Sequence, residues 1–218
     1  MDRFIRCIEL FGKEGFKKLQ EANILILGVG GVGSFALECL YKSGVQNITI
    51  IDFDRYETSN LNRQLGSEGN IGEVKVEALK KKYPNIKTLN QKINKEFIEQ
   101  FDFSPYDIVI DAIDDTKAKI ELALRVHNKL IMSLGSAKRI DFSKIEIANS
   151  IFKTHGDRLA KKIRYELKKR KFNKKFDVVF SSEEPKSSSG SFMGVTGAFG
   201  LAICSLVVQK ILKEKDES

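Results

Sequence analysis

The sequence predicts an α/β fold of the Rossmann type, with a mostly parallel sheet, helices on both of its faces, and a C-terminal antiparallel extension with further helices. Three observations carry this prediction. Short apolar runs that end in glycine or aspartate occur at 22–28, 47–52 and 106–111, as expected of buried parallel strands. Segments with helical spacing separate these runs. A glycine-rich turn follows the first of them, where a helix begins.

The first half of the chain is expected to alternate between strands and helices. Residues 31–43 carry apolar residues at helical spacing and connect the first two strands into a βαβ unit. A second helix is expected to stop before Pro84, because proline cannot continue a helix. After the strand at 22–28, the expected elements are a helix at 31–43, a strand at 47–52, a helix at 73–82, a weaker strand at 87–93, a strand at 106–111, a helix at 116–127 and a strand at 129–133.

The pattern changes after Gly135. Residues 144–148 alternate between apolar and polar, which predicts a half-exposed antiparallel strand. A basic helix is expected in 158–175, a short strand at 177–180, and a mobile loop at 181–191, where Ser, Glu and Gly dominate. The chain is therefore interpreted as one domain, 1–218, made of a nucleotide-binding core at 1–135 and an extension at 136–218.

The C-terminal run 192–212 is almost entirely apolar and is long enough to pass for a membrane span. It also contains Gly194, Gly197 and Gly200, a spacing that allows close helix packing in soluble cores as well. Because the preceding strands need a helix to cover their sheet, we expect a buried helix in the core or in a dimer interface, and no membrane association.

Composition indicates a globular protein of the reducing cytoplasm. The chain has 218 residues, a length that is typical of one large domain or of one domain with an appendage. Its three cysteines form no CxxC pair, which argues against a structural zinc site and against a disulfide framework. No secretory signal is expected, since charged residues interrupt the N-terminus and no apolar segment follows them.

The net charge is +8, and the excess is concentrated in 158–175, where Glu166 alone opposes ten lysines and arginines. Such a patch favours a polyanionic partner, with a nucleic-acid backbone the usual one. A solvated basic surface is the alternative that charge alone leaves open.

The turn after the first strand contains Gly28, Gly30, Gly31 and Gly33. Glycines let the backbone approach phosphates closely, and the helix N-terminus adds oriented N–H groups. Asp52 ends the next strand, where a carboxylate can accept hydrogen bonds from ribose hydroxyls. These features predict a nucleotide without choosing between NAD and ATP.

Polar residues just past the second strand favour ATP. Asp54 is followed by Asn62, Arg63 and then Lys75. A triphosphate requires cations, since arginine binds phosphate oxygens in a fork and lysine supplies a mobile charge. Ordinary surface charges are the alternative for Arg63 and Lys75.

Carboxylates also follow the strand at 106–111. Asp111, Asp114 and Asp115 come at the end of a parallel strand, where ligands bind. We assign Asp114 to Mg²⁺, which carboxylates hold against phosphates, and Asp115 to the cap of the helix that begins at Thr116.

The order of these motifs resembles a known superfamily. GVGGVG, IDFD, SNLNRQ, GEVKVE and DAIDD follow one another as in the ubiquitin-activating-enzyme-like, ThiF-type adenylyltransferases. The resemblance implies that Gly31 and Asp52 contact ATP, that Arg63 and Lys75 bind its phosphates, and that Asp114 binds the metal. It also implies a homodimer in which an N-terminal arginine reaches the partner's ATP. Arg6 is the candidate for that arginine.

The C-terminal third resembles the tRNA threonylcarbamoyladenosine dehydratase subgroup of that superfamily, through LGS, IEIA, DRLAKKIR, VFSSEEP and TGAFGL. This implies an ATP-dependent dehydration that cyclises a modified adenosine in tRNA through an acyl-adenylate. The expected tRNA contacts are Arg158, Lys161, Lys162, Lys168 and Lys169. Docking of a sulfur-relay partner is left open.

Three other functions remain as alternatives. An adenylyltransferase that activates the C-terminus of a sulfur-carrier protein commonly has paired CxxC zinc ligands, which the chain lacks. A nicotinamide oxidoreductase has no need of the Arg63, Lys75 and Asp114 set. The third alternative is an RNA-binding protein without catalytic activity.

Overall fold

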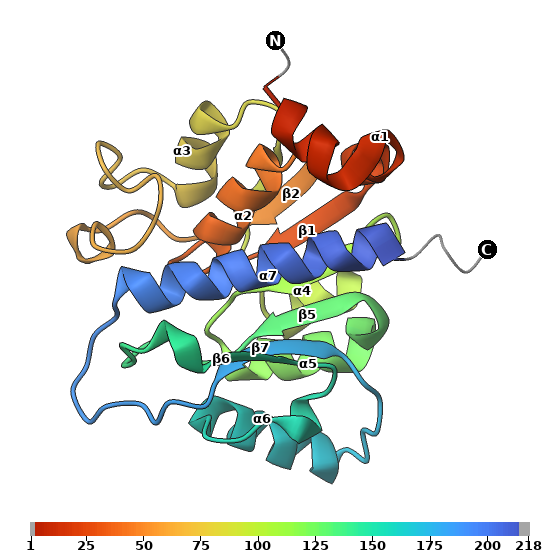
Figure 1. Cartoon of the computed structure of the whole chain (residues 1–218). Coiled ribbons are helices and arrows are strands. Elements are labelled where there is room, and N and C mark those ends of the chain that lie inside the picture. Colours follow the sequence, from red (N-terminus) through yellow and green to blue (C-terminus); the bar gives the residue numbers. More distant parts are fainter. Residues whose placement is uncertain (1–2, 214–218) are drawn as a thin grey trace.

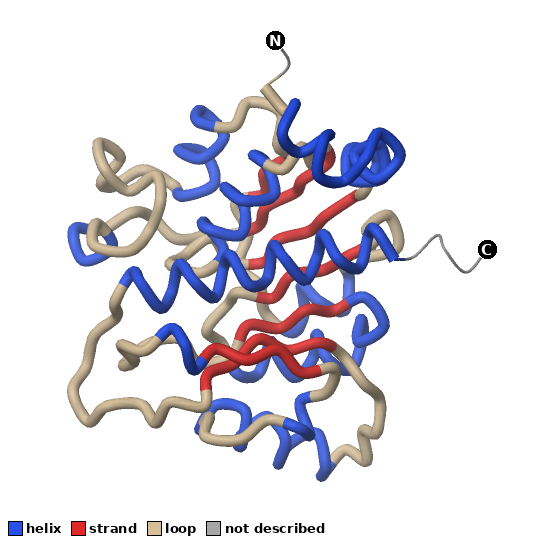
Figure 2. Tube along the Cα trace, viewed as in Figure 1, coloured by secondary structure: helices blue, strands red, loops and turns tan. Residues whose placement is uncertain are grey.

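A computed structural model describes residues 3–213, whose strands form one seven-stranded sheet in the order β3-β2-β1-β4-β5-β7-β6 (Figures 1 and 2). The strands are β1 Asn23–Leu27, β2 Asn47–Ile51, β3 Lys87–Leu89, β4 Ile108–Asp111, β5 Leu130–Ser133, β6 Ile145–Ala148 and β7 Asp177–Ser181. All neighbours are parallel except β6 and β7, which are antiparallel. The predicted fold class and the antiparallel extension are confirmed.

Helices cover both faces of the sheet (Figure 1). One face carries α1 Ile5–Glu21, α2 Gly33–Lys42, α3 Lys75–Lys82 and α7 Met193–Lys213, and the other carries α4 Lys95–Gln100, α5 Thr116–Val126 and α6 Arg158–Lys169. Short 3₁₀ helices are η1 Thr58–Asn60, η2 His127–Lys129, η3 Phe142–Lys144 and η4 Ile151–Lys153. Successive side chains of a strand point to opposite faces of the sheet, so a continuous apolar strand contributes to both. In β1, Ile24 and Ile26 belong to the core on one face, and Leu25 and Leu27 belong to the core on the other.

Several elements differ from the sequence predictions. The helices α1 and α4 were not predicted, since α1 is interrupted by Gly12 at φ +72° and α4 spans only six residues. The weak strand expected at 87–93 ends at Leu89. The basic helix ends at Lys169, well short of the predicted 175, because the chain turns at Lys171, where φ is +55°.

The apolar helix α7 packs along α2 and the sheet. Gly200 allows the closest contact, because a Cβ there would lie 2.5 Å from the carbonyl oxygen of Val32. Val195, Phe199 and Ile203 are fully buried. By length and composition alone α7 could cross a membrane, yet half of its most apolar stretch is buried against the rest of the chain. The prediction of a packed core helix is therefore supported.

The expectation that the chain holds no disulfide is wrong for this structure. The sulfurs of Cys39 on α2 and Cys204 on α7 are paired, with their Cα atoms 6.1 Å apart. The two cysteines are 165 residues apart, and only the packing of α7 on α2 brings them together. Cys7 on α1 is a free thiol.

Candidate nucleotide-binding site

The predicted motifs meet at one edge of the sheet because three central strands end in register. Leu27 of β1 is aligned with Ile51 of β2 and with Asp111 of β4. The residues that follow these positions therefore emerge side by side at the carboxyl edge, where ligands bind in open α/β sheets. Backbone hydrogen bonds hold this edge together, from Gly28 N–H to Ile51 O at 2.8 Å and from Ala112 N–H to Leu27 O at 2.8 Å.

Two glycines of the glycine-rich turn, Gly28 and Gly33, stand where the neighbouring backbone leaves no room for a side chain. At Gly28, where φ is +85°, a Cβ would lie 2.8 Å from Ala112 O, and at Gly33 it would lie 1.9 Å from Gly28 O. Gly30 and Gly31 face a cavity, whereas Gly33 is packed into the turn and does not line it. The turn thus offers bare backbone and the N-terminus of α2 to a ligand, an arrangement suited to phosphate.

Asp52 is buried, and its carboxylate holds the turn. One oxygen accepts the N–H of Val29 at 2.8 Å and the other accepts the N–H of Asp54 at 2.9 Å. Each carboxylate oxygen has a second acceptor position that these bonds leave available for a ribose hydroxyl. Asp54 in turn accepts from Lys75 Nζ at 2.9 Å, and the Lys75 side chain is only 6% exposed. The role of Asp54 in the structure is therefore to orient a buried cation toward the cavity.

Arg63 is held by its own loop. Its Nη1 donates to Ser59 O at 2.7 Å and to Asn62 Oδ1 at 2.9 Å. Asn62 also donates to Ser191 O at 3.0 Å, so it connects this loop to the segment before α7. Asn62 does not itself line the cavity.

Tyr56 holds the same loop from its buried side. Its hydroxyl donates to Leu65 O at 2.8 Å. Burial raises the pKa of Tyr56, and the nearby Asp52 carboxylate adds to the increase.

The three aspartates after β4 have separate roles. Asp115 caps α5 by accepting the N–H of Ala118 at 2.7 Å, as predicted. Asp111 is fully buried and accepts from Lys119 Nζ at 2.9 Å, and Lys119 also donates to Ser133 O at 2.7 Å. Burial outweighs this pairing and raises the pKa of Asp111. Asp114 is exposed, and within residues 3–213 its carboxylate has no hydrogen-bonding partner.

A cavity of about 810 Å³ joins these groups. The predicted residues that line it are Gly28, Gly30, Gly31, Asp52, Asp54, Arg63, Lys75 and Asp114. The described part of the chain holds no cluster of three His, Cys, Asp or Glu side chains that could bind a metal. The Asp114 carboxylate, which has no partner among the described residues, could hold a divalent cation here together with substrate oxygens, and Mg²⁺ commonly uses one or two carboxylates and phosphates.

Further lining residues were missed by sequence reasoning. They include Phe53, Gln64, Lys92, Asn94, Lys95, Lys117, Leu134, Gly135, Ser136, Ala137, Leu159, Ser191 and Thr196. Gln64 stands in the quoted SNLNRQ motif and could have been found there, and its side-chain oxygen is buried without a partner among the described residues. Other missed residues also stand in the quoted motifs: Phe53 in IDFD, Leu134, Gly135 and Ser136 in LGS, Leu159 in DRLAKKIR, and Thr196 in TGAFGL. The rest come from loops and helix ends that share no periodic signal.

The remaining predicted residues lie outside the cavity. Arg6 on α1 has a side chain that is 90% exposed and pairs with Glu9 at 3.0 Å. The five predicted cations of α6 are all exposed, and Leu159 is the one residue of that helix that lines the cavity. The buried stripe of α6 is Ala160, Ile163 and Leu167, so its basic face points to solvent.

Comparison with known proteins agrees with this geometry. The ThiF family matches residues 1–216. The chain is 38% identical to the tRNA threonylcarbamoyladenosine dehydratase of Bacillus subtilis, covering 85% of this chain and 76% of that protein, and 33% identical to the dehydratase of Haemophilus influenzae, covering 94% and 92%. The crystal structure of the Escherichia coli dehydratase in complex with AMP superimposes with a TM-score of 0.91 at 29% identity, covering 98% of this chain and 96% of that one.

Proteins of the carrier-activating type match over a shorter span. The molybdopterin-synthase adenylyltransferase of Haemophilus influenzae is 33% identical over 59% of this chain. The similarity to the dehydratases thus extends through the C-terminal part of the chain, while the similarity to this adenylyltransferase covers little more than half.

Proposed function

The chain belongs to the ThiF family, and we propose that it is an ATP-dependent enzyme that dehydrates and so cyclises threonylcarbamoyladenosine in tRNA. The observation that carries the proposal is the cavity at the strand ends, which combines a bare glycine turn with Arg63 and Lys75, in a chain that matches named dehydratases over nearly its whole length. We treat 1–218 as a single ThiF-type domain, with the core at 1–135 and the extension at 136–218.

The reaction has two steps. The carboxylate of the threonylcarbamoyl group attacks the α-phosphorus of ATP, which forms an acyl-adenylate and releases pyrophosphate. The carbamoyl oxygen of the same substrate then attacks the activated carbonyl, closes the ring and expels AMP. Arg63 and Lys75 offset phosphate charge, and the backbone of Gly30 and Gly31 receives the phosphates, so the protein contributes chiefly orientation and electrostatic stabilisation.

This scheme needs no protein nucleophile. Among the described residues no cysteine lines the cavity, since Cys39 and Cys204 are paired between α2 and α7, and Cys7 lies on α1. Asp114 would hold Mg²⁺, whose charge would help to neutralise the phosphates. Asp114→Ala should then raise the concentration of Mg²⁺ required for half-maximal pyrophosphate exchange, and an unchanged requirement would remove Asp114 from this role.

The exposed cations of α6 and the exposed side chain of Arg6 suggest two partners, a tRNA and a second copy of the chain. The cations of α6 are proposed to contact the tRNA backbone, and the enzyme is proposed to act as a cytoplasmic homodimer in which Arg6 reaches the partner's ATP. A 90% exposed Arg6 that lies outside its own cavity suits a role across a dimer interface. Docking of a sulfur-relay protein has no specific contact to support it.

The main alternative is activation of a ubiquitin-like sulfur-carrier protein. An ATP–pyrophosphate exchange assay separates the two functions, with tRNA that carries threonylcarbamoyladenosine in one arm and a sulfur-carrier protein in the other. We expect exchange in the tRNA arm, accompanied by a loss of one water from the nucleoside in mass spectrometry. Exchange in the carrier arm alone would refute the proposal.

A further inference from the structure

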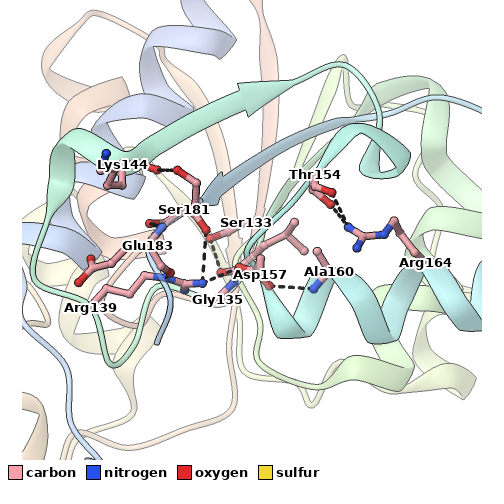
Figure 3. A network of polar contacts seen from close by, with 12 residues as sticks. Ser133, Gly135, Arg139, Lys144, Thr154, Asp157, Ala160, Arg164, Ser181 and Glu183 are labelled. Atoms are coloured by element: carbon pink, nitrogen blue, oxygen red, sulfur yellow. Dashed lines mark hydrogen bonds and ion pairs between the residues drawn. The ribbon is translucent and has the colours of Figure 1, made fainter. Parts of the chain in front are cut away.

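A buried ion pair lies between the cavity and the basic helix. Arg139 belongs to the segment after β5, and Asp157 precedes α6. Their side chains are 2% and 1% exposed, with Nη2 of the arginine 3.1 Å from Oδ2 of the aspartate. Figure 3 shows the guanidinium group directed at Asp157. Neither residue lines the cavity, so the pair acts on the site only through what it holds.

Asp157 is bonded to both the cavity wall and the helix. Its Oδ1 accepts the N–H of Ala160 at 2.8 Å and thereby caps α6, while Oδ2 accepts the N–H of Gly135 at 3.2 Å (Figure 3). Gly135 lines the cavity, and so does Leu159 in the first turn of α6. A single carboxylate thus fixes the first turn of the basic helix to the wall of the cavity.

Arg139 adds a third segment. Its Nε donates to Glu183 O at 2.8 Å and its Nη2 to Ser181 O at 3.4 Å. The Glu183 carboxylate accepts the N–H groups of Ile140 and Asp141 at 3.1 and 2.9 Å. The end of β7 and the residues that follow it are thereby bound to the segment that follows β5.

Arg139 takes no part in the cap of α6. The N–H of Ala160 donates to Asp157 and forms that cap, and the apolar stripe of the helix is buried. A buried ion pair is also a poor source of stability compared with apolar side chains of similar size, whereas its directed bonds impose a definite geometry. The bonds of Arg139 therefore point to a need for a fixed geometry between the helix and the cavity wall.

We propose that Arg139 and Asp157 are positioning residues that hold α6, and the tRNA bound to it, at a set distance from the nucleotide end of the cavity. This inference rests on the proposed function, in which the tRNA must bring one carboxylate within reach of the α-phosphorus of ATP. A displacement of about 1 Å at such a site can lower a rate by about 10²-fold. The glycine turn proposed to receive ATP forms no hydrogen bond with either member of the pair among the described residues, so ATP binding is expected to be independent of the pair.

Arg139→Gln tests the inference, because it removes the charge and keeps the cap of α6. Arg139→Lys retains a cation beside Asp157 and serves as the conservative variant. Asp177→Asn is the matched control, since it breaks an ion pair with Lys210 at 2.6 Å that links β7 to α7 away from the cavity. Unfolding curves identify the temperature at which all variants are folded, and the assays are done there.

We expect ATP affinity without tRNA, and tRNA affinity without ATP, to be unchanged in Arg139→Gln. The single-turnover rate with both substrates saturating should fall about 10²-fold. Arg139→Lys should recover most of that loss, and Asp177→Asn should react at the wild-type rate. An unchanged rate in Arg139→Gln overturns the inference. A parallel loss of ATP binding, tRNA binding and rate also overturns it, since a purely structural role produces that result.

Failure of the proposed function would look different, because the wild-type chain itself would then convert no threonylcarbamoyladenosine. Amide hydrogen exchange gives a readout that does not depend on the substrate. Arg139→Gln should accelerate exchange at Gly135 and in the first turn of α6 together, with no change in α3. Unchanged exchange in both places overturns the inference whatever the substrate is.

Discussion

Replacing Lys161, Lys162, Lys168 and Lys169 by glutamate should weaken tRNA binding and reduce its dependence on salt. All four side chains are exposed on α6, and none forms an ion pair with the described residues. Each phosphate contact contributes about 0.9 to the slope of log affinity against log salt for duplex RNA treated as B-DNA, or about 0.7 for a single strand. Four contacts therefore account for a slope of about 3.6 or 2.8, which is a loss of about 10²-fold in affinity between about 50 and 200 mM salt.

The assay is a salt titration of tRNA binding by the wild-type chain and the four-lysine variant, with ATP binding measured in parallel. The control carries glutamate at Lys13, Lys17, Lys81 and Lys87, exposed lysines of α1, α3 and β3, which the sheet order places far from α6. An unchanged affinity and slope in the α6 variant would refute the assignment of this helix to tRNA. Equal losses in the control variant would mean that net charge, and not the position of the charges, governs binding.

Three further predictions concern single groups. Arg63→Ala should abolish tRNA-dependent pyrophosphate exchange and leave the chain folded, because the loop groups that lose its hydrogen bonds are exposed to water; normal exchange would contradict its phosphate role. Replacing Cys39 and Cys204 by alanine should retain dehydratase activity and lower the unfolding free energy by about 2–4 kcal/mol without reductant; a thioester trapped on either cysteine would revive the carrier-protein alternative. Burial raises the pKa of Asp111 above its ordinary 3.8, so the folded state binds the proton more tightly and loses stability from this group as pH rises through the raised pKa. Asp111→Asn should remove that part of the pH dependence in urea unfolding as the pH rises above 3.8, and an unchanged dependence would contradict the raised pKa.

Much of the site could be predicted from sequence because parallel strands place their carboxyl ends at one edge. Gly30, Asp52 and Asp114 each follow a strong apolar run, so the fold class alone brings them together. The cap at Asp115 was predictable for a similar reason, since it depends only on the helix that begins at the next residue. Local patterns were sufficient wherever the interacting groups were near in sequence or stood at the ends of regular strands.

Other features depend on contacts that no local pattern encodes. Asn62 looked like a nucleotide ligand from its motif, yet it bonds to Ser191, 129 residues away. The pairing of Cys39 with Cys204 requires α7 to lie along α2, which glycine at position 200 allows.

The sequence by itself determined the strands of the sheet, the glycine turn and the described α-helices other than α1 and α4, because these follow from periodicity and from residue type. It also proposed Arg63 and Lys75 as the cations for phosphate. Only the tertiary structure decided what the segments after β5 and β7 contribute. The ion pair of Arg139 with Asp157, and the cavity wall that it holds beside α6, join residues 18 positions apart through a fully buried contact. Such contacts are set by how layers pack in space, and in the sequence each member looks like an ordinary charged residue of a loop.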